Sequence, residues 1–181
     1  MSHIAPELAT SHAIDLPELL SSRECRQARQ QAWLARHNST LLVLTLVVPG
    51  AVKDSPMTRQ VFNLGWQALQ QRYQQQGWRC LQEETRALST GCEGYLALQA
   101  DAYAVKKVTI ELEQQHPIGR LWDIDVLTPP GQILSRADLG LPERYCLLCE
   151  KPAKICARQR RHSTEQLLTE MQRRLNVALA I

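Results

Sequence analysis

The sequence predicts an α/β domain, with an α+β arrangement as the alternative, in which helices pack against a mixed β-sheet. Apolar stretches typical of strands alternate along the chain with amphipathic stretches at helical spacing. The 181 residues suit one domain, and no repeat, long linker or low-complexity block divides them. We expect residues 1–20 to form a loosely ordered arm and residues 21–181 to form a single domain.

The first half of the chain contains two predicted helices around one strand. A helix over residues 21–37 can be capped by Ser21 or Ser22, and its Gln and Arg side chains should face solvent. Residues 40–48 are continuously apolar, which favours a central strand covered on both faces. Residues 55–77 begin with Ser-Pro, a strong helix start, and then repeat apolar side chains every three or four positions.

The second half continues the alternation of strands and helices. Residues 78–88 and 94–100 read as two strands joined by a turn. An aspartate caps the helix predicted over residues 101–116, and residues 120–127 form the next strand. After an irregular segment, a capping box at its start predicts a last helix over residues 163–179.

Composition narrows the class of protein and its location. The 21 Lys and Arg residues against 18 Asp and Glu give a net charge of +3, too small to indicate a nucleic-acid partner. A single Phe leaves few surfaces for stacking bases. The longest apolar run falls short of the roughly 20 residues of a membrane helix, and the N-terminus lacks the features of a signal peptide. We therefore expect a cytoplasmic protein with no membrane contact, whose six cysteines stay reduced.

Asp123 and Asp125 are the strongest candidates for catalysis. Residues two apart on a strand project to the same face, and both carboxylates lie within an apolar stretch. Such a pair needs a cation, and Mg²⁺ held by one or two carboxylates together with substrate phosphates would supply it. The alternative is that each aspartate is a cap, an ion-pair partner or a solvated edge charge.

Four further residues are candidates for binding or catalysis. Gly119 would let a phosphate approach the backbone, and Arg120 can bind phosphate oxygens or pair with one of the aspartates. Lys53 precedes a helix N-terminus, where it would neutralise a phosphate or simply be solvated. Glu93 lies in the glycine-flanked turn of residues 90–94 and is a candidate general base or metal ligand, or else an exposed acid of the turn.

The cysteines of the irregular segment form a candidate metal site. Cys146 and Cys149 have the C-x₂-C spacing of a zinc knuckle, and Cys156 and His162 would complete four ligands for Zn²⁺. A structural zinc ion would explain how a segment with little apolar periodicity keeps one shape. Ordinary packing of the thiols is the alternative.

A basic cluster overlaps these cysteines. No acidic residue interrupts its members, which are Lys151, Lys154, Arg158, Arg160 and Arg161. Such a cluster suits a polyphosphate or an acidic protein partner, and a solvated basic loop is the alternative. Elsewhere, Cys25 and Cys80 are predicted to be small core residues.

Four stretches, taken together, resemble the citrate lyase holo-acyl-carrier-protein synthase family, also called apo-citrate lyase phosphoribosyl-dephospho-CoA transferase. They are PGAVK at 49–53, TGCEGY at 90–95, GRLWDIDV at 119–126 and CLLCEKPAKICARQRRH at 146–162. The order and spacing of the four make the resemblance far more specific than any one motif. The resemblance extends from about residue 41 to the C-terminal helix.

The resemblance implies a reaction and roles for the candidate residues. The donor would be 2′-(5″-triphosphoribosyl)-3′-dephospho-CoA, and a serine of the apo acyl-carrier subunit of citrate lyase would attack its α-phosphorus and release pyrophosphate. In a nucleotidyltransferase-like site, Asp123 and Asp125 would hold Mg²⁺ against the triphosphate. Arg120 and Lys53 would neutralise its charge, and Glu93 would help to deprotonate the serine.

Two other functions fit parts of the sequence. One is a binding module, in which a zinc-stabilised basic segment with Arg158, Arg160 and Arg161 docks an acidic protein or a nucleic acid. The other is a protein adenylyltransferase that uses ATP as its donor. Comparison of ATP with the dephospho-CoA donor separates the two enzymes.

Overall fold

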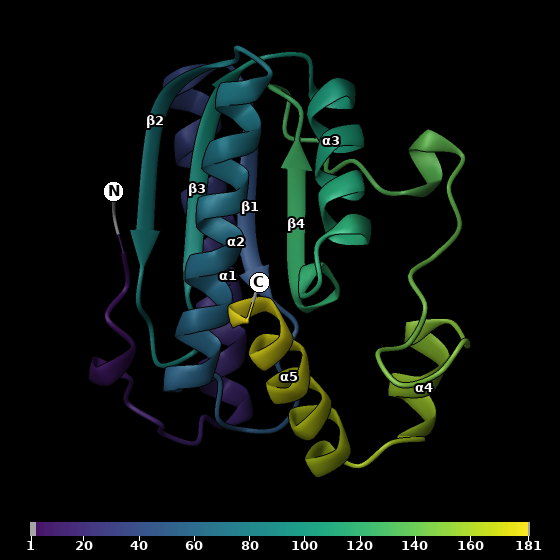
Figure 1. Cartoon of the computed structure of the whole chain (residues 1–181). Coiled ribbons are helices and arrows are strands. Elements are labelled where there is room, and N and C mark those ends of the chain that lie inside the picture. The colour runs from purple at the N-terminus through teal and green to yellow at the C-terminus, as the bar shows by residue number, and fades with distance from the viewer. Residues whose placement is uncertain (1–2, 181) are drawn as a thin grey trace.

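A computed structural model describes residues 3–180 of the chain, in which four strands form one sheet of order β2-β3-β1-β4 (Figure 1). The strands are β1 (Thr40–Leu46), β2 (Arg79–Arg86), β3 (Glu93–Gln99) and β4 (Trp122–Leu127). The helices are α1 (Leu16–His37), α2 (Pro56–Gln75), α3 (Ala102–Gln115), α4 (Ala153–Gln159) and α5 (Thr164–Leu179). Three short 3₁₀ turns are η1 (Pro6–Leu8), η2 (Gly119–Leu121) and η3 (Ala137–Leu139).

The topology is a split β-α-β arrangement. The order β1-α2-β2-β3-α3-β4 is that of ferredoxin-like domains, with α1 added before it and α4 and α5 after it. Helix α2 connects β1 to β2, and α3 connects β3 to β4; in each case one other strand lies between the two connected strands. That intervening strand runs in the opposite direction to its two neighbours. All three strand pairings are therefore antiparallel. The expected class of helices and strands in one domain is confirmed, as its α+β alternative, whereas the expected mixed sheet is wrong in its strand directions.

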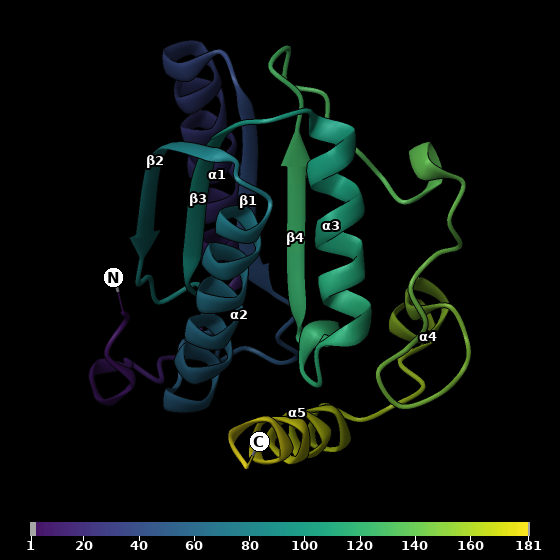
Figure 2. The same cartoon turned by 45° about the horizontal axis from the view of Figure 1, so that its top comes forward.

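One face of the sheet packs against α2, α3 and α5 (Figures 1 and 2). Leu42, Leu44 and Ile124 point to this face and meet Phe62 and Trp66 of α2 in the larger apolar core. Side chains alternate across a strand, so the neighbouring residues must point to the opposite face.

The opposite face packs against α1, which lies behind the sheet in both views (Figures 1 and 2). Leu41, Val43 and Tyr95 meet Trp33 and Leu34 of α1 in a second apolar cluster. The prediction that the first strand is central and covered on both faces is thereby confirmed. The sheet face toward α1 is also the face to which the odd-numbered residues of β4 belong, because Val43 pairs with Asp125 across the strands.

Helix α1 begins earlier than its serines predict. Asp15 caps it: its Oδ1 accepts from the Glu18 amide at 2.8 Å, and Glu18 Oε2 accepts from the Asp15 amide at 2.8 Å. This reciprocal capping box satisfies two amides that have no partner inside the helix. Ser21 and Ser22 consequently lie inside the helix, and the expected cap at either of them is wrong.

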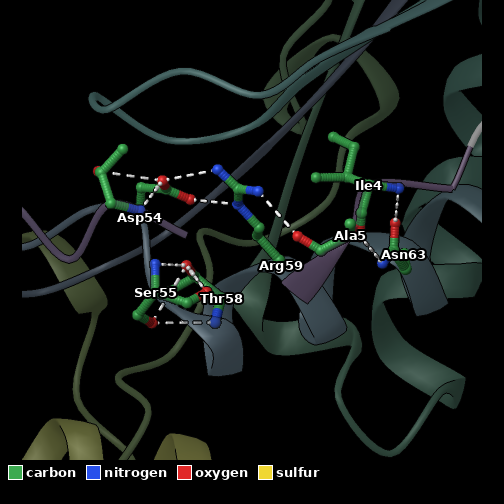
Figure 3. Close-up of polar contacts among 8 residues, drawn as sticks. Ile4, Ala5, Asp54, Ser55, Thr58, Arg59 and Asn63 are labelled. Carbon is green, nitrogen blue, oxygen red and sulfur yellow. Dashed lines mark hydrogen bonds and ion pairs between the residues drawn. The ribbon is translucent and has the colours of Figure 1, made fainter. Parts of the chain in front are cut away.

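Buried polar contacts join the chain before α1, which lies within the predicted arm of residues 1–20, to the start of α2. The Ile4 amide donates to Asn63 Oδ1 at 3.0 Å, and the side chain of Ile4 is buried. Asp54 and Arg59 form a buried two-bond ion pair of 2.6 and 2.8 Å, and Arg59 also donates to a carbonyl of the arm (Figure 3). Residues 1 and 2 of the expected arm lie outside the described residues.

The outer edge of β4 is covered by side chains from α3 and the segment after β4. Lys106 Nζ donates to the Ile124 carbonyl at 3.1 Å, and Glu113 Oε1 accepts from the Ile124 amide at 3.3 Å. Arg144 Nη1 donates to the Trp122 carbonyl at 3.0 Å. These contacts satisfy an edge that would otherwise expose its backbone, and they fix the strand that carries the two aspartates. Between residues 3 and 180, no helix combines the length and the hydrophobicity needed to cross a membrane.

Candidate active site

The two aspartates of β4 lie in a groove between that strand and α1. Asp125 lines a cavity of about 690 Å³. Asp123 lines a neighbouring cavity of about 280 Å³, and its side chain is 48% exposed. We call the two cavities together the acidic groove. The predicted projection of both carboxylates to one face of the strand therefore holds.

Cationic side chains surround the acidic groove. Arg23 and Arg26 of α1 line both cavities, and Lys53 lines the smaller one together with the turn at Gly91. Lys53 Nζ donates to the Val48 carbonyl at 2.6 Å, and burial and the nearby Arg23 lower the pKa of this amine. Guanidinium and ammonium groups beside paired carboxylates are suited to binding phosphates and their metal ion.

Among residues 3–180, no side chain or backbone group forms a hydrogen bond or ion pair with the Asp125 carboxylate. Burial, followed by the charge of Asp123, raises the pKa of Asp125, and the charges of Lys106, Arg144 and Arg26 partly oppose this shift. Asp123 has one close cation, Arg144 Nη1, at 3.4 Å from its Oδ1. Asp125 is half-buried beside a second carboxylate, and such a pair needs a cation, so the residues present fit a Mg²⁺ ion with oxygen ligands.

Glu93 is buried in an ion-pair network and is not an exposed acid of the turn. Its side chain is 1% exposed, with Arg26 Nε at 2.8 Å from one oxygen and Arg29 Nη1 at 2.5 Å from the other. Tyr95 donates a further hydrogen bond to the same carboxylate. With both oxygens engaged, Glu93 ties β3 to α1 and orients Arg26 toward the acidic groove.

Gly119 and Arg120 lie outside the acidic groove. The Arg120 guanidinium donates to the Tyr145 carbonyl, and within residues 3–180 it forms no ion pair with either aspartate. A Cβ atom on Gly119 would collide with the backbone of Glu113, so glycine is needed here for close packing of the turn against α3. The motif of residues 119–126 therefore combines two residues that lie outside the acidic groove with two aspartates that line it.

The four predicted metal ligands converge. The ligand atoms of Cys146, Cys149, Cys156 and His162 all lie within 4.8 Å of one another, which makes this Cys/His cluster a potential metal site. Cys149 Sγ lies 3.4 Å from Cys156 Sγ and 3.4 Å from His162 Nε2. The grouping inferred from spacing is confirmed as a spatial cluster.

A third cavity, of about 580 Å³, separates the cluster from the end of β1. Arg120 and Arg160 line it together with Cys146 and Cys156. Arg158 and Arg161 are exposed near the end of α4. The predicted binding residues thus divide between two places, with Lys53 in the acidic groove and Arg120 and Arg160 in the third cavity.

Two expectations about single side chains are wrong. Cys25 was expected in the core and is exposed on α1, whereas Cys80 is half-buried and packs against the main apolar core as expected. The arginines of α1 were expected to face solvent, yet the side chains of Arg26 and Arg29 are 25% and 20% exposed and point to the sheet. Their three-residue spacing was the available signal, because it places them on one helix face.

A split β-α-β sheet with paired carboxylates among cationic side chains defines the class: an α+β protein whose site suits phosphorylated ligands. The family model described as apo-citrate lyase phosphoribosyl-dephospho-CoA transferase matches residues 14–178. A relative of that name from Escherichia coli O7:K1 is 52% identical over 174 residues, 96% of this chain and 95% of the relative. Another, from Shigella boydii serotype 18, is 51% identical over the same shares. The chain therefore belongs to the apo-citrate lyase phosphoribosyl-dephospho-CoA transferase family, as its four motifs predicted.

Proposed function

We propose that this protein transfers the 5-phosphoribosyl-dephospho-CoA group from 2′-(5″-triphosphoribosyl)-3′-dephospho-CoA to a serine of the apo acyl-carrier subunit of citrate lyase. Membership of the transferase family supports the reaction. The observation that supports the location is the acidic groove, where Asp123 and Asp125 lie beside Arg23, Arg26 and Lys53. Neither a nucleic-acid module nor an ATP-dependent adenylyltransferase draws support from that membership.

The groove offers the groups that this reaction needs. The serine oxygen forms a bond to the α-phosphorus, the bond from that phosphorus to the pyrophosphate breaks, and the serine loses its proton. Asp123 and Asp125 would hold Mg²⁺, which neutralises charge on the triphosphate when bound. Lys53 and Arg26 would bind the phosphate oxygens from the facing side of the groove.

The remaining predicted residues take more remote roles in this proposal. Glu93 would position Arg26 rather than remove the serine proton, because both of its oxygens already accept charged donors. Arg120 and Arg160 would contact the donor or the carrier at the third cavity, whose residues Val47 and Val48 also line the acidic groove. Arg158 and Arg161 remain candidates for the carrier surface.

The Cys/His cluster would hold Zn²⁺ in a structural role. Three thiolates and an imidazole are a usual zinc ligand set, and four protein ligands leave no open position for a substrate. None of the four residues lines either cavity of the acidic groove; Cys146, Cys156 and His162 line the separate third cavity. Mg²⁺ is thus the only metal that the proposal assigns to the reaction.

Intact mass spectrometry of the apo-carrier, incubated with the protein, the donor and Mg²⁺, tests the proposal. Wild type should add the mass of the prosthetic group, whereas Asp123→Asn and Asp125→Asn should lower the rate by at least about 100-fold. Asp138→Asn, which changes an exposed aspartate beyond β4, serves as the matched control and should keep the wild-type rate. Full activity of both groove variants, or no modification by folded wild type, would contradict the proposal.

A further inference from the structure

The segment of residues 144–162, which we call the knuckle, buries too little apolar surface to explain its shape. Cys156 is the only buried residue of the seven-residue helix α4. Tyr145, Leu148 and Ile155 are 58%, 37% and 43% exposed. Only Leu147 packs against the main apolar core. A short segment of this kind usually needs a disulfide or a metal ion to hold one conformation.

The backbone of the knuckle nevertheless has a defined fold that gathers the Cys/His cluster. The Cys146 amide donates to the Lys151 carbonyl at 2.7 Å, and the Ala153 amide donates to the Arg144 carbonyl at 2.9 Å. After α4, Arg160 takes a left-handed conformation with φ of 47°, and the Arg161 amide bonds back to Cys156. The chain then turns His162 toward the thiols.

The separations within the Cys/His cluster match a tetrahedral zinc site. With Zn–S bonds of about 2.3 Å, two sulfur ligands of one zinc ion lie about 3.8 Å apart. The observed separations of 3.4 Å and the outer limit of 4.8 Å bracket that value. Cys146, Cys149 and Cys156 form no disulfide bond, so all three thiols are available to a metal ion. Thiolates are soft ligands, which favour zinc over magnesium or calcium.

The knuckle is connected to the acidic groove through Arg144, two residues before the first ligand. Arg144 donates to the Trp122 carbonyl, pairs with Glu113, and has Nη1 at 3.4 Å from Asp123 Oδ1. The next residue, Tyr145, accepts from Arg120. The position of Arg144 therefore depends on where Cys146 is held.

We infer that Cys146, Cys149, Cys156 and His162 bind one structural zinc ion, and that this ion holds the knuckle so that Arg144 stays beside Asp123. The zinc ion has four protein ligands and takes no part in the chemistry. Its occupancy is independent of the proposed transfer reaction, whereas the placement of Arg144 as a positioning residue rests on that proposal.

Metal analysis of the purified full chain tests the zinc site directly. Wild type should contain one zinc per chain, and Co²⁺ added to the metal-free protein should give a thiolate-to-cobalt charge-transfer band. Cys149→Ser should lose both signals, while Cys25→Ser, which removes an exposed thiol of α1, should keep them. Failure of reduced wild type to bind either metal, or equal binding by the two variants, would overturn the inference.

Two further measurements examine the consequence for the knuckle. Chelation of zinc should make residues 144–162 sensitive to limited proteolysis, while circular dichroism retains the signal of the sheet and long helices. In Cys149→Ser, the KM for Mg²⁺ in the transfer reaction should change at least several-fold, because Arg144 would no longer be held 3.4 Å from Asp123, and Cys25→Ser should not change it. A knuckle equally resistant with and without zinc would overturn the structural role, whatever the outcome of the transfer assay.

Discussion

At the scale of single residues, the account depends on the contrast between Asp123 and Asp125. Both side chains are half-buried, but Arg144 Nη1 lies 3.4 Å from Asp123 Oδ1, whereas Asp125 forms no ion pair with any of residues 3–180. Burial of an unpaired carboxylate is unfavourable in the free protein. In the proposed function, a Mg²⁺ ion bound to the same carboxylate would offset this cost.

The raised pKa of Asp125 gives a pH-dependent prediction. Because the folded state holds the proton more tightly than the unfolded chain, this residue lowers stability as pH rises through the window between the ordinary and the raised pKa. Without Mg²⁺, Asp125→Asn should therefore increase the free energy of unfolding at pH 7 by about 1 kcal/mol. Urea unfolding should show the gain disappear below about pH 4, the ordinary aspartate range.

Asp138→Asn provides the control for this effect. Hydrogen bonds from Ser135 lower the pKa of Asp138, so its charged form is favoured in the folded protein and no gain at pH 7 is expected. If Asp125→Asn destabilised the metal-free protein at pH 7, the carboxylate would have a partner that this account denies.

At the scale of elements, the attachment of α1 to the sheet joins residues distant in the sequence. Glu93 on β3 bonds to Arg26 and Arg29 of α1, 67 and 64 residues away. Trp33 and Leu34 of the same helix pack against apolar side chains of the sheet. The attachment is thus both apolar and ionic, and it sets the wall of the acidic groove.

Glu93→Gln should remove the charge that both arginines need. Leaving two largely buried guanidinium groups without their anion should lower the free energy of unfolding by about 3 kcal/mol. Glu84→Gln is the matched control, since Glu84 and Arg86 form a half-exposed pair that should contribute at most about 1 kcal/mol. Chemical denaturation measures both variants.

Kinetics separate the positioning role of Glu93 from a role as general base. Below its unfolding temperature, Glu93→Gln should raise the KM for the donor, because Arg26 loses its orientation, and should keep the shape of the pH–rate profile. A stable variant that loses the acidic limb of that profile would instead identify Glu93 as the base.

Much of the element structure could be predicted from local signals, and the reasons differ between elements. Ser55, Asp101 and Ser163 cap their helices as predicted, because capping depends on neighbouring residues alone. Residues 119–121 form a 3₁₀ turn rather than the start of a strand, since Gly119 packs against α3. Strand order, the partners of Glu93 and the approach of Arg144 to Asp123 depend on contacts between distant residues, which no local pattern reports.

At the scale of the whole molecule, charge is distributed over two regions. The acidic groove combines carboxylates with cations on the α1 side of the sheet, whereas the exposed basic residues of the knuckle lie in α4 and next to it, and Figure 2 shows α4 apart from α1. This separation suits a reaction with two substrates of different size. A donor would occupy the groove while a protein partner contacts the knuckle.

Charge reversal in the knuckle tests this division of surfaces. Arg160→Glu combined with Arg161→Glu should raise the KM for the carrier more than the KM for the donor, about 10-fold at low salt, because exposed charges act mainly on protein encounter. Lys107→Glu, an exposed charge change on α3, is the control and should alter neither value. An equal rise in both KM values would place the donor at the knuckle.

The most direct test of the central claim is the mass of the apo-carrier after reaction with equal concentrations of the triphosphoribosyl-dephospho-CoA donor and ATP in the presence of Mg²⁺. The account predicts one product, a carrier heavier by a single 5-phosphoribosyl-dephospho-CoA group, with pyrophosphate released in equal amount. A carrier that gains AMP instead, or an unmodified carrier beside fully folded protein, would contradict it.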